Sequence, residues 1–527
     1  MLSATERPAW REEYDGRWAL ELGLLAVLLG VAAAVAPLGD PDLPLHLALG
    51  EWIVRHGAVP TVEPFAWTRE GEPFYAYSWL PEVAFYLTYD AAGVTGLRIV
   101  QGIMTAAIVA AVFVLARLAR WSIWTAIVLA GVQGLMATVL APYLRPHMVL
   151  LIVVPLAWGC ALRVLETDRP LRWAAGLFVI GAIAANSHLL FPLTAAPWLL
   201  LAIRWPGAKR ALWLIGPTLA GWLVTPYLLE WPAVFALNFN ENPLFRYPTP
   251  ISELTPGVQA AVSGRGGLLV IAVVLSLLPW TASRLTIRER VVWGGAWLAG
   301  LFAFALAARA VVLWWMLVLP LVAAAMEPLA RVPRRRGIIV GQRIALAALV
   351  ALLALGRARV ADAPWSDDTG ARRFLPSRTA SSVDPIVRWL ECRVTQGANG
   401  RAFTAFSLGT YLTWHHPALS YSIDTRNIFP DSVALAEGYV LASRTDVPLG
   451  PWQSADLAIV PVDYQVSAVL DTANAWRPAV VIEGSPPVPA AGLWVTERWW
   501  RTVSDSALPS SAVRLPSGRA GLEAACR

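Results

Sequence analysis

Long apolar runs alternate with short polar segments along the first two thirds of the chain. Most of these runs reach the roughly 17 residues that a helix needs to cross a hydrocarbon core of about 30 Å. The pattern therefore predicts an α-helical polytopic membrane protein of about eleven transmembrane helices. The predicted spans lie near 18–38, 97–116, 122–141, 148–164, 172–186, 189–203, 211–229, 267–282, 291–308, 311–329 and 342–357.

The pattern of polar and apolar positions changes after residue 357. A polar linker leads into short β-like runs at 401–406, 419–423, 455–460 and 480–483, with a helical stretch near 384–392. Short strands that alternate with turns and a helix are typical of a small α/β domain. We therefore predict a transmembrane domain, 1–357, with a long first loop at 39–96, and a soluble α/β domain, 358–527.

Composition and charge extend this prediction to topology. Hydrophobic residues make up 57% of the chain and charged residues 15%, whereas a soluble domain needs a more charged surface. The net charge of +6 comes almost wholly from arginine, since Lys209 is the only lysine. The basic residues gather in alternate loops, near 117–120, 163–172, 204–210, 284–290 and 331–343.

Basic loops of this kind usually face the cytoplasm. The N-terminus is then cytoplasmic, and an odd number of spans places the first loop and the α/β domain on the outer side. Membrane lipids are the expected surroundings, and no nucleic-acid partner is expected. Of the three cysteines, Cys160 lies in an apolar run, while Cys392 and Cys526 lie in the outer domain, where pairing is open.

The first loop begins with two carboxylates one residue apart, Asp40 and Asp42, followed four residues later by His46. These side chains could supply a general base or hold a divalent cation. The alternative is that both aspartates cap a helix that starts near Leu43, because aspartate is favoured at helix starts. The motif alone does not decide between the two. The same loop carries tryptophans expected to anchor short helices at the membrane interface, namely Trp52, Trp67 and Trp79.

Further polar residues lie at the outer ends of the predicted spans, and all six histidines fall on the outer side. Ionisable groups at membrane depth are costly and often mark functional sites. Each of them could instead cap a helix or extend to the headgroups. As a set they favour one outward-facing polar site, and the candidates for substrate or phosphate binding are His46, Glu63, Arg145, His147, His188, Glu253 and Arg309.

Several short motifs occur together along most of the chain. They are D-P-D-L-x-x-H-L at 40–47, G-E-W-I-x-x-H-G-x-x-P at 50–60, S-W-L-x-E at 78–82, R-P-H at 145–147, N-x-H at 186–188, Arg309, G-x-Y-L at 409–412 and I-D-x-R at 423–426. Together they resemble a group of bacterial proteins within the GT-C class of membrane glycosyltransferases. The chain departs from that group at Pro44 and Leu45, where aromatic residues are expected, and at Glu63, where an aspartate is expected.

The resemblance implies a GT-C-like fold and transfer of a sugar from a polyprenyl-phosphate-linked donor. The acceptor would lie on the outer face of a bacterial inner membrane. Asp42 or Asp40 would act as the base, and Asp40 and His46 could contact a divalent cation.

Arg145, His147 or Arg309 would then face the lipid phosphate, which arginine binds well through its forked guanidinium. Two other functions remain open: a transporter or flippase for a lipid-linked or anionic substrate, and a non-catalytic membrane assembly protein. A transporter usually has charges near mid-membrane and repeated halves, neither of which the sequence shows. Asp424 and Arg426 could bind a ligand or form an ion pair at a strand end.

Overall fold

The computed structural model describes residues 16–35, 38, 40, 42–139, 143–240, 286–306, 310–330, 377–393, 400–404, 406–415, 417–422, 454–461, 470, 476–483, 491–504 and 507–527. The chain divides into two compact units. The first, here the helical unit, comprises Met1–Ala36, Leu97–Glu230 and Thr249–Ala361. The second, here the mixed unit, comprises Pro37–Gly96, Trp231–Pro248 and Asp362–Arg527. Most of the first loop therefore belongs with the C-terminal residues and not with the helices that flank it in sequence.

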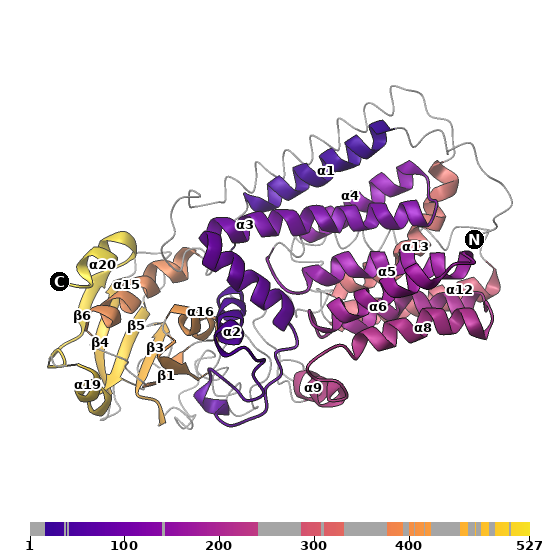
Figure 1. The fold of residues 1–527 in the computed structure, drawn as a ribbon. Coiled ribbons are helices and arrows are strands. Elements are labelled where there is room, and N and C mark those ends of the chain that lie inside the picture. Colours follow the sequence, from indigo (N-terminus) through magenta and orange to yellow (C-terminus); the bar gives the residue numbers. More distant parts are fainter. Residues whose placement is uncertain are drawn as a thin grey trace. The chain divides into compact units, whose positions relative to one another are not determined.

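The helical unit follows the predicted apolar runs closely. Its elements (Figure 1) are α1 (Gly16–Ala34), the later part of α3 (Trp79–Leu118), α4 (Ile123–Val139), α5 (Met148–Glu166), α6 (Leu171–Ala185), the 3₁₀-helix η3 (Phe191–Trp198), α7 (Leu199–Ile203), α8 (Ala208–Trp222), α12 (Ile287–Leu306) and α13 (Ala310–Ala330). The predicted spans at 267–282 and 342–357 lie outside the described residues.

Two helices in the described part of the chain are long and apolar enough to cross a membrane, α3 and α5. Shorter apolar helices accompany them at Gly23–Ala34, Ile123–Gly134, Leu171–Ala185, Phe191–Ile203 and Trp314–Ala324. The architecture is thus mainly helical with a C-terminal sheet, and the total of eleven spans stays a prediction.

Small residues allow the helices of this unit to approach closely. A Cβ added to Gly102 of α3 would lie 2.7 Å from the carbonyl oxygen of Gly30 in α1, so the backbones meet there. The crossing of α6 and α8 is of the same kind, because a Cβ added to Gly181 would lie 2.8 Å from the carbonyl oxygen of Thr218. Close approach at small residues is typical of helices packed within a membrane.

The predicted span at 189–203 is not one regular α-helix. Its first part is the 3₁₀-helix η3, and only five residues, Leu199–Ile203, are α-helical. Pro192 and Pro197 lack the backbone N–H that a regular helix needs, which accounts for the difference. A second irregularity lies in α3, where Gly93 (φ 57°, ψ −153°) breaks the helical backbone.

The C-terminal part of the mixed unit is the α/β domain that the sequence predicted. Its strands are β1 (Gly400–Thr404), β2 (Leu419–Tyr421), β3 (Leu457–Pro461), β4 (Trp476–Glu483), β5 (Ala491–Thr496) and β6 (Val513–Pro516). They form one mixed sheet in the order β2-β1-β3-β5-β4-β6, in which β5 runs antiparallel to both of its neighbours. The accompanying helices are α15 (Ser377–Arg393), α16 (Phe406–His415), α19 (Glu497–Val503) and α20 (Gly518–Ala524).

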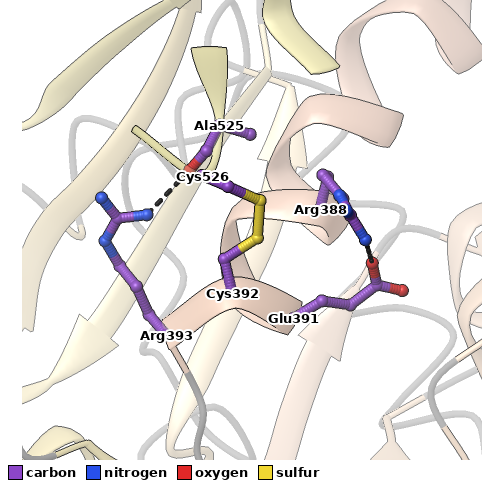
Figure 2. The surroundings of a disulfide bond; sticks show 6 residues. All are labelled: Arg388, Glu391, Cys392, Arg393, Ala525 and Cys526. Atoms are coloured by element: carbon purple, nitrogen blue, oxygen red, sulfur yellow. Dashed lines mark hydrogen bonds and ion pairs between the residues drawn. A yellow bond between two sulfur atoms is a disulfide. The ribbon is translucent and has the colours of Figure 1, made fainter. Parts of the chain in front are cut away.

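A disulfide bond joins Cys392 at the end of α15 to Cys526 after α20, with the two Cα atoms 5.5 Å apart (Figure 2). Beside it, the guanidinium of Arg393 donates to the carbonyl oxygen of Ala525 at 2.7 Å. The pairing that the sequence left open is therefore present.

The first loop is a folded part of the mixed unit. It contains α2 (Leu43–His56), the short 3₁₀-helix η2 (Trp67–Arg69) and the part of α3 before Gly93. Its core comprises Leu45, Leu49, Ile53, Ala66, Phe74, Ala76 and Leu237. Leu237 comes from η4 (Ala236–Asn240), which follows α9 (Trp231–Phe235). Helix α2 ends because Gly57 adopts a left-handed conformation (φ 63°), which glycine tolerates best.

Candidate functional site

The start of α2 places the two aspartates of the D-x-D motif. Asp42 is the N-cap residue, but its side chain makes no capping hydrogen bond to the helix. The backbone N–H of Asp42 instead donates to Oδ1 of Asp40, at 3.1 Å. Asp40 is fully buried, whereas Asp42 is half-buried. Asp42 thus occupies the N-cap position of the helix, as the capping interpretation predicted, but its carboxylate does not act as a cap.

One helical turn later, His46 contacts a third carboxylate. Nδ1 of His46 lies 3.0 Å from Oε1 of Glu82, in the first turn of α3, and the hydroxyl of Ser78 donates to the same oxygen at 2.7 Å. The side chain of Glu82 is only 2% exposed and that of His46 is 16% exposed, so His46 is the more accessible member of the pair. Among the residues that the structure describes, the other oxygen of Glu82 has no hydrogen-bond partner.

The His46–Glu82 pair depends on the close packing of α2 against α3. Gly50 of α2 lies directly on α3: a Cβ added there would overlap the carbonyl oxygen of Glu82 and the Cβ of Tyr86. A residue with a side chain would therefore push the two helices apart. The glycine fixes the separation at which His46 reaches Glu82.

The electrostatics of this group favour a protonated His46. Burial alone lowers the pKa of His46, but the hydrogen bond and charge of Glu82, together with the charges of Asp42 and Asp40, raise it above its ordinary value of 6.5. A partly buried imidazolium beside three carboxylates offsets part of their mutual repulsion.

Because the pKa of His46 is raised on folding, its contribution to stability is fully present below pH 6.5 and is lost as the pH rises through the raised value. Each unit by which the pKa is raised is worth about 1.4 kcal/mol. Thermal unfolding of the detergent-purified wild type and of His46→Gln, compared between about pH 6 and 9, measures this contribution. The stability advantage of the wild type should shrink toward high pH, and a constant advantage would contradict the assignment.

The residues at this site do not form a ready metal centre. Among the described residues, no three His, Cys, Asp or Glu side chains are grouped to hold an ion. Nδ1 of His46 is already bonded to Glu82, and hard divalent cations take six or more oxygen ligands. A divalent cation at Asp40 and His46 therefore stays a prediction.

Glu63, a predicted ligand-binding residue, is found within the backbone of the first loop. It is 8% exposed, and its Oε1 accepts the N–H groups of Phe65 and Ala66 at 2.9 and 3.1 Å. A carboxylate that accepts two backbone N–H groups fixes the turn that it spans. The structure thus gives Glu63 a turn-forming role.

A second polar group lies in the helical unit. The rings of His147 and His188 meet edge to face with centroids 6.3 Å apart, although one precedes α5 and the other follows α6. Nδ1 of His188 accepts the N–H of Leu190, which leaves its other nitrogen as the donor in the neutral ring. The guanidinium of Arg145 lies 5.3 Å from the ring centre of Tyr143. Two of the predicted outer turns are therefore brought together.

The structure thus gathers the predicted residues into two groups, one in each unit. The convergence of both groups on one site stays a prediction, and Glu253 and Arg309 lie outside the described residues. Glu82 and Ser78 are residues of the first group that the sequence did not single out as site residues. The only signal for them was the S-W-L-x-E motif at 78–82, whose partner His46 lies 36 residues earlier.

Several solved structures are similar to the chain. The arabinofuranosyltransferase AftD from mycobacteria aligns with 92% of the chain at 16% identity and a TM-score of 0.52, and the chain spans only 40% of AftD. The oligosaccharyltransferase AglB from Archaeoglobus fulgidus, solved with an inhibitory peptide and dolichol-phosphate, aligns with 95% of the chain at 12% identity. The TM-score there is 0.54, and 76% of AglB is covered.

The third structure is ArnT from Cupriavidus metallidurans bound to undecaprenyl phosphate. It aligns with 91% of the chain at 14% identity and a TM-score of 0.51, and 98% of ArnT is covered. No protein-family model and no curated protein sequence matches the chain. The chain therefore shares the fold of these solved structures, as expected from the resemblance of its sequence motifs to the GT-C class.

Proposed function

We propose that the protein is a glycosyltransferase that moves a sugar from a polyprenyl-phosphate-linked donor to an acceptor on the outer face of a bacterial inner membrane. The observation that carries the proposal is the start of α2 in a chain of GT-C fold. There a half-buried Asp42 is held by the buried Asp40 and lies one helical turn from His46. The solved structures with dolichol-phosphate and undecaprenyl phosphate support a polyprenyl phosphate carrier.

Asp42 is the proposed base. Its carboxylate is partly exposed, so it can reach a hydroxyl or amino group of an acceptor, and it takes the proton as the acceptor attacks the sugar carbon. A positioned base of this kind contributes roughly 10²–10⁴-fold to a rate. Asp40, which is fully buried, is the proposed positioning partner, since its Oδ1 accepts the Asp42 N–H.

The leaving phosphate of the donor needs positive charge or hydrogen-bond donors. The proposed groups are Arg145, His147 and His188 in the helical unit, with Arg309 as a further candidate. A cluster of three carboxylates and one imidazolium at α2 suits an uncharged acceptor better than a phosphate, because like charges repel. We therefore propose that the α2 group binds the acceptor.

The test uses the detergent-purified protein and a radiolabelled pool of polyprenyl-phosphate-linked sugars, with envelope extract as the source of acceptor. Label should move from the lipid to an acceptor. A control variant, Glu51→Gln, alters a partly exposed residue of α2 that pairs with Arg55 and should retain transfer. A transporter gives a different result: in sealed vesicles, label crosses the bilayer while it remains on its lipid.

A further inference from the structure

The edge of the C-terminal sheet continues into the first loop. Ala66 forms a parallel bridge with Tyr421 of β2, the edge strand. The N–H of Tyr421 donates to the carbonyl oxygen of Phe65 at 3.2 Å, and the hydroxyl of Thr68 donates to the backbone carbonyl oxygen of Ser422 at 2.5 Å. The segment 63–70, here called the loop anchor, thus pairs with a strand more than 330 residues later in the chain.

Trp67 is the main apolar contact of the loop anchor. Its ring packs against the buried cluster of the α/β domain, which includes Phe403, Ala458 and Trp494. Its indole N–H donates to the carbonyl oxygen of Ala402 at 3.2 Å. The ring expected at the membrane interface is therefore packed on protein.

Arg401 of β1 adds polar contacts to the loop anchor. Its guanidinium lies 5.7 Å from the centre of the Trp67 ring and forms an ion pair with Glu70 at 3.2 Å. An exposed ion pair of this kind contributes little by itself, whereas a large aromatic ring buries much surface with few rotatable bonds. Trp67 is therefore the part of the anchor with the largest expected effect.

The loop anchor is tied to the helix that carries the candidate base. Ala66 belongs to the same buried cluster as Leu45 and Leu49 of α2. Glu63 fixes the turn into Ala66 through two backbone hydrogen bonds. A displacement of the anchor is thus transmitted through packed side chains to α2.

A second contact reaches α3, which carries Glu82. Trp414 of α16 meets Tyr86 and Tyr89 edge to face, with ring centres 6.2 and 5.3 Å apart. Helix α16 also packs along α2. The α/β domain therefore supports both helices of the Asp42 group.

We propose that the C-terminal α/β domain holds α2 and the start of α3, the two helices of the candidate active site, in place. Trp67 and Trp414 are positioning residues for the transfer. This assignment rests on the proposed function, and it gives the domain a role besides binding a partner. The donor phosphate, assigned to the helical unit, should be bound independently of the anchor.

The test combines hydrogen exchange with kinetics on the full-length protein. In Trp67→Ala, the Tyr421 amide, which is bonded to the anchor, should exchange at least roughly tenfold faster, because its partner segment detaches. The kcat for transfer should fall by roughly tenfold or more, since a base displaced by about 1 Å costs up to 10²-fold. The KM for the lipid donor should stay within about twofold.

Milder variants keep the test decisive if Trp67→Ala does not fold. Trp67→Phe retains a ring but lacks the N–H, so its kcat should lie between those of wild type and alanine. Arg401→Glu and Glu70→Arg each bring two like charges together and should loosen the anchor slightly, and the double variant, which restores opposite charges, should reverse this effect. The matched controls are the same exchange of charges at Arg514 and Glu483, an exposed pair of the sheet at 3.5 Å, and Trp205→Ala, whose ring is 60% exposed.

The outcomes separate the two proposals. A Tyr421 amide that exchanges fast while kcat is unchanged overturns the positioning role. So does a fall in kcat with the amide still protected in Trp67→Ala. If the wild type transfers no sugar, the proposed function fails, and hydrogen exchange alone then decides whether the domain holds the loop.

Discussion

Asp42→Asn is expected to lower sugar transfer by at least roughly 100-fold, the lower end of what a positioned base contributes. Asparagine keeps the size of the side chain but cannot take a proton. The fold should be unchanged, because the side chain of Asp42 does not cap α2. The rate of label transfer, measured beside thermal unfolding, separates lost chemistry from lost structure.

Asp40→Asn should have a smaller effect. An amide oxygen can still accept the N–H of Asp42, so the geometry survives, while a buried charge is lost. Asp90→Asn is the matched control, since Asp90 is an exposed acid of α3 in the same unit. Full activity in both Asp40→Asn and Asp42→Asn would remove the catalytic assignment.

Gly50→Ala is expected to damage the site although it changes no polar side chain. The added Cβ would overlap the carbonyl oxygen of Glu82 and the Cβ of Tyr86, so α2 and α3 must separate. Overpacking of this kind typically costs about 1–3 kcal/mol. Because His46 then moves away from Glu82, transfer should fall by roughly tenfold or more.

Gly295→Ala is the control for this substitution. Gly295 also lies in a helix, α12, but an added Cβ there would meet no heavy atom within 4 Å. Alanine should therefore be neutral or slightly stabilising. Thermal unfolding and transfer of the two alanine variants, measured side by side, distinguish steric separation from a general effect of glycine replacement.

The helices were predictable because their signal is local. Apolar runs at 122–141 and 148–164 became α4 and α5 with ends only a few residues away. The predicted span at 189–203 is also an apolar helix, but its first part is a 3₁₀-helix because two prolines remove backbone donors, a local cause that a hydropathy average does not register. Four strands of the α/β domain, β1 to β4, were also found, since alternation and turns are short-range patterns, whereas β5 and β6 were missed.

The site was only partly predictable because its contacts are long-range. Asp40, Asp42 and His46 share one helix start and were found from their spacing. Glu82 was missed as their partner, since only the packing of α2 on α3 brings it to His46. Trp67 was expected to anchor the loop in the membrane interface, but its partners lie more than 330 residues away. No pattern within the loop encodes that pairing.

Trp67 and Ala402, which pair in the folded protein, are 335 positions apart in the chain. The loop anchor can therefore form only late in synthesis. At about 5–20 residues per second, roughly 20–70 s separate the appearance of the two residues. The disulfide then requires Cys526, so the domain closes only after that residue has left the ribosome. A nascent chain thus carries its candidate base long before the support for that base exists, and it is expected to be inactive until translation has passed that point.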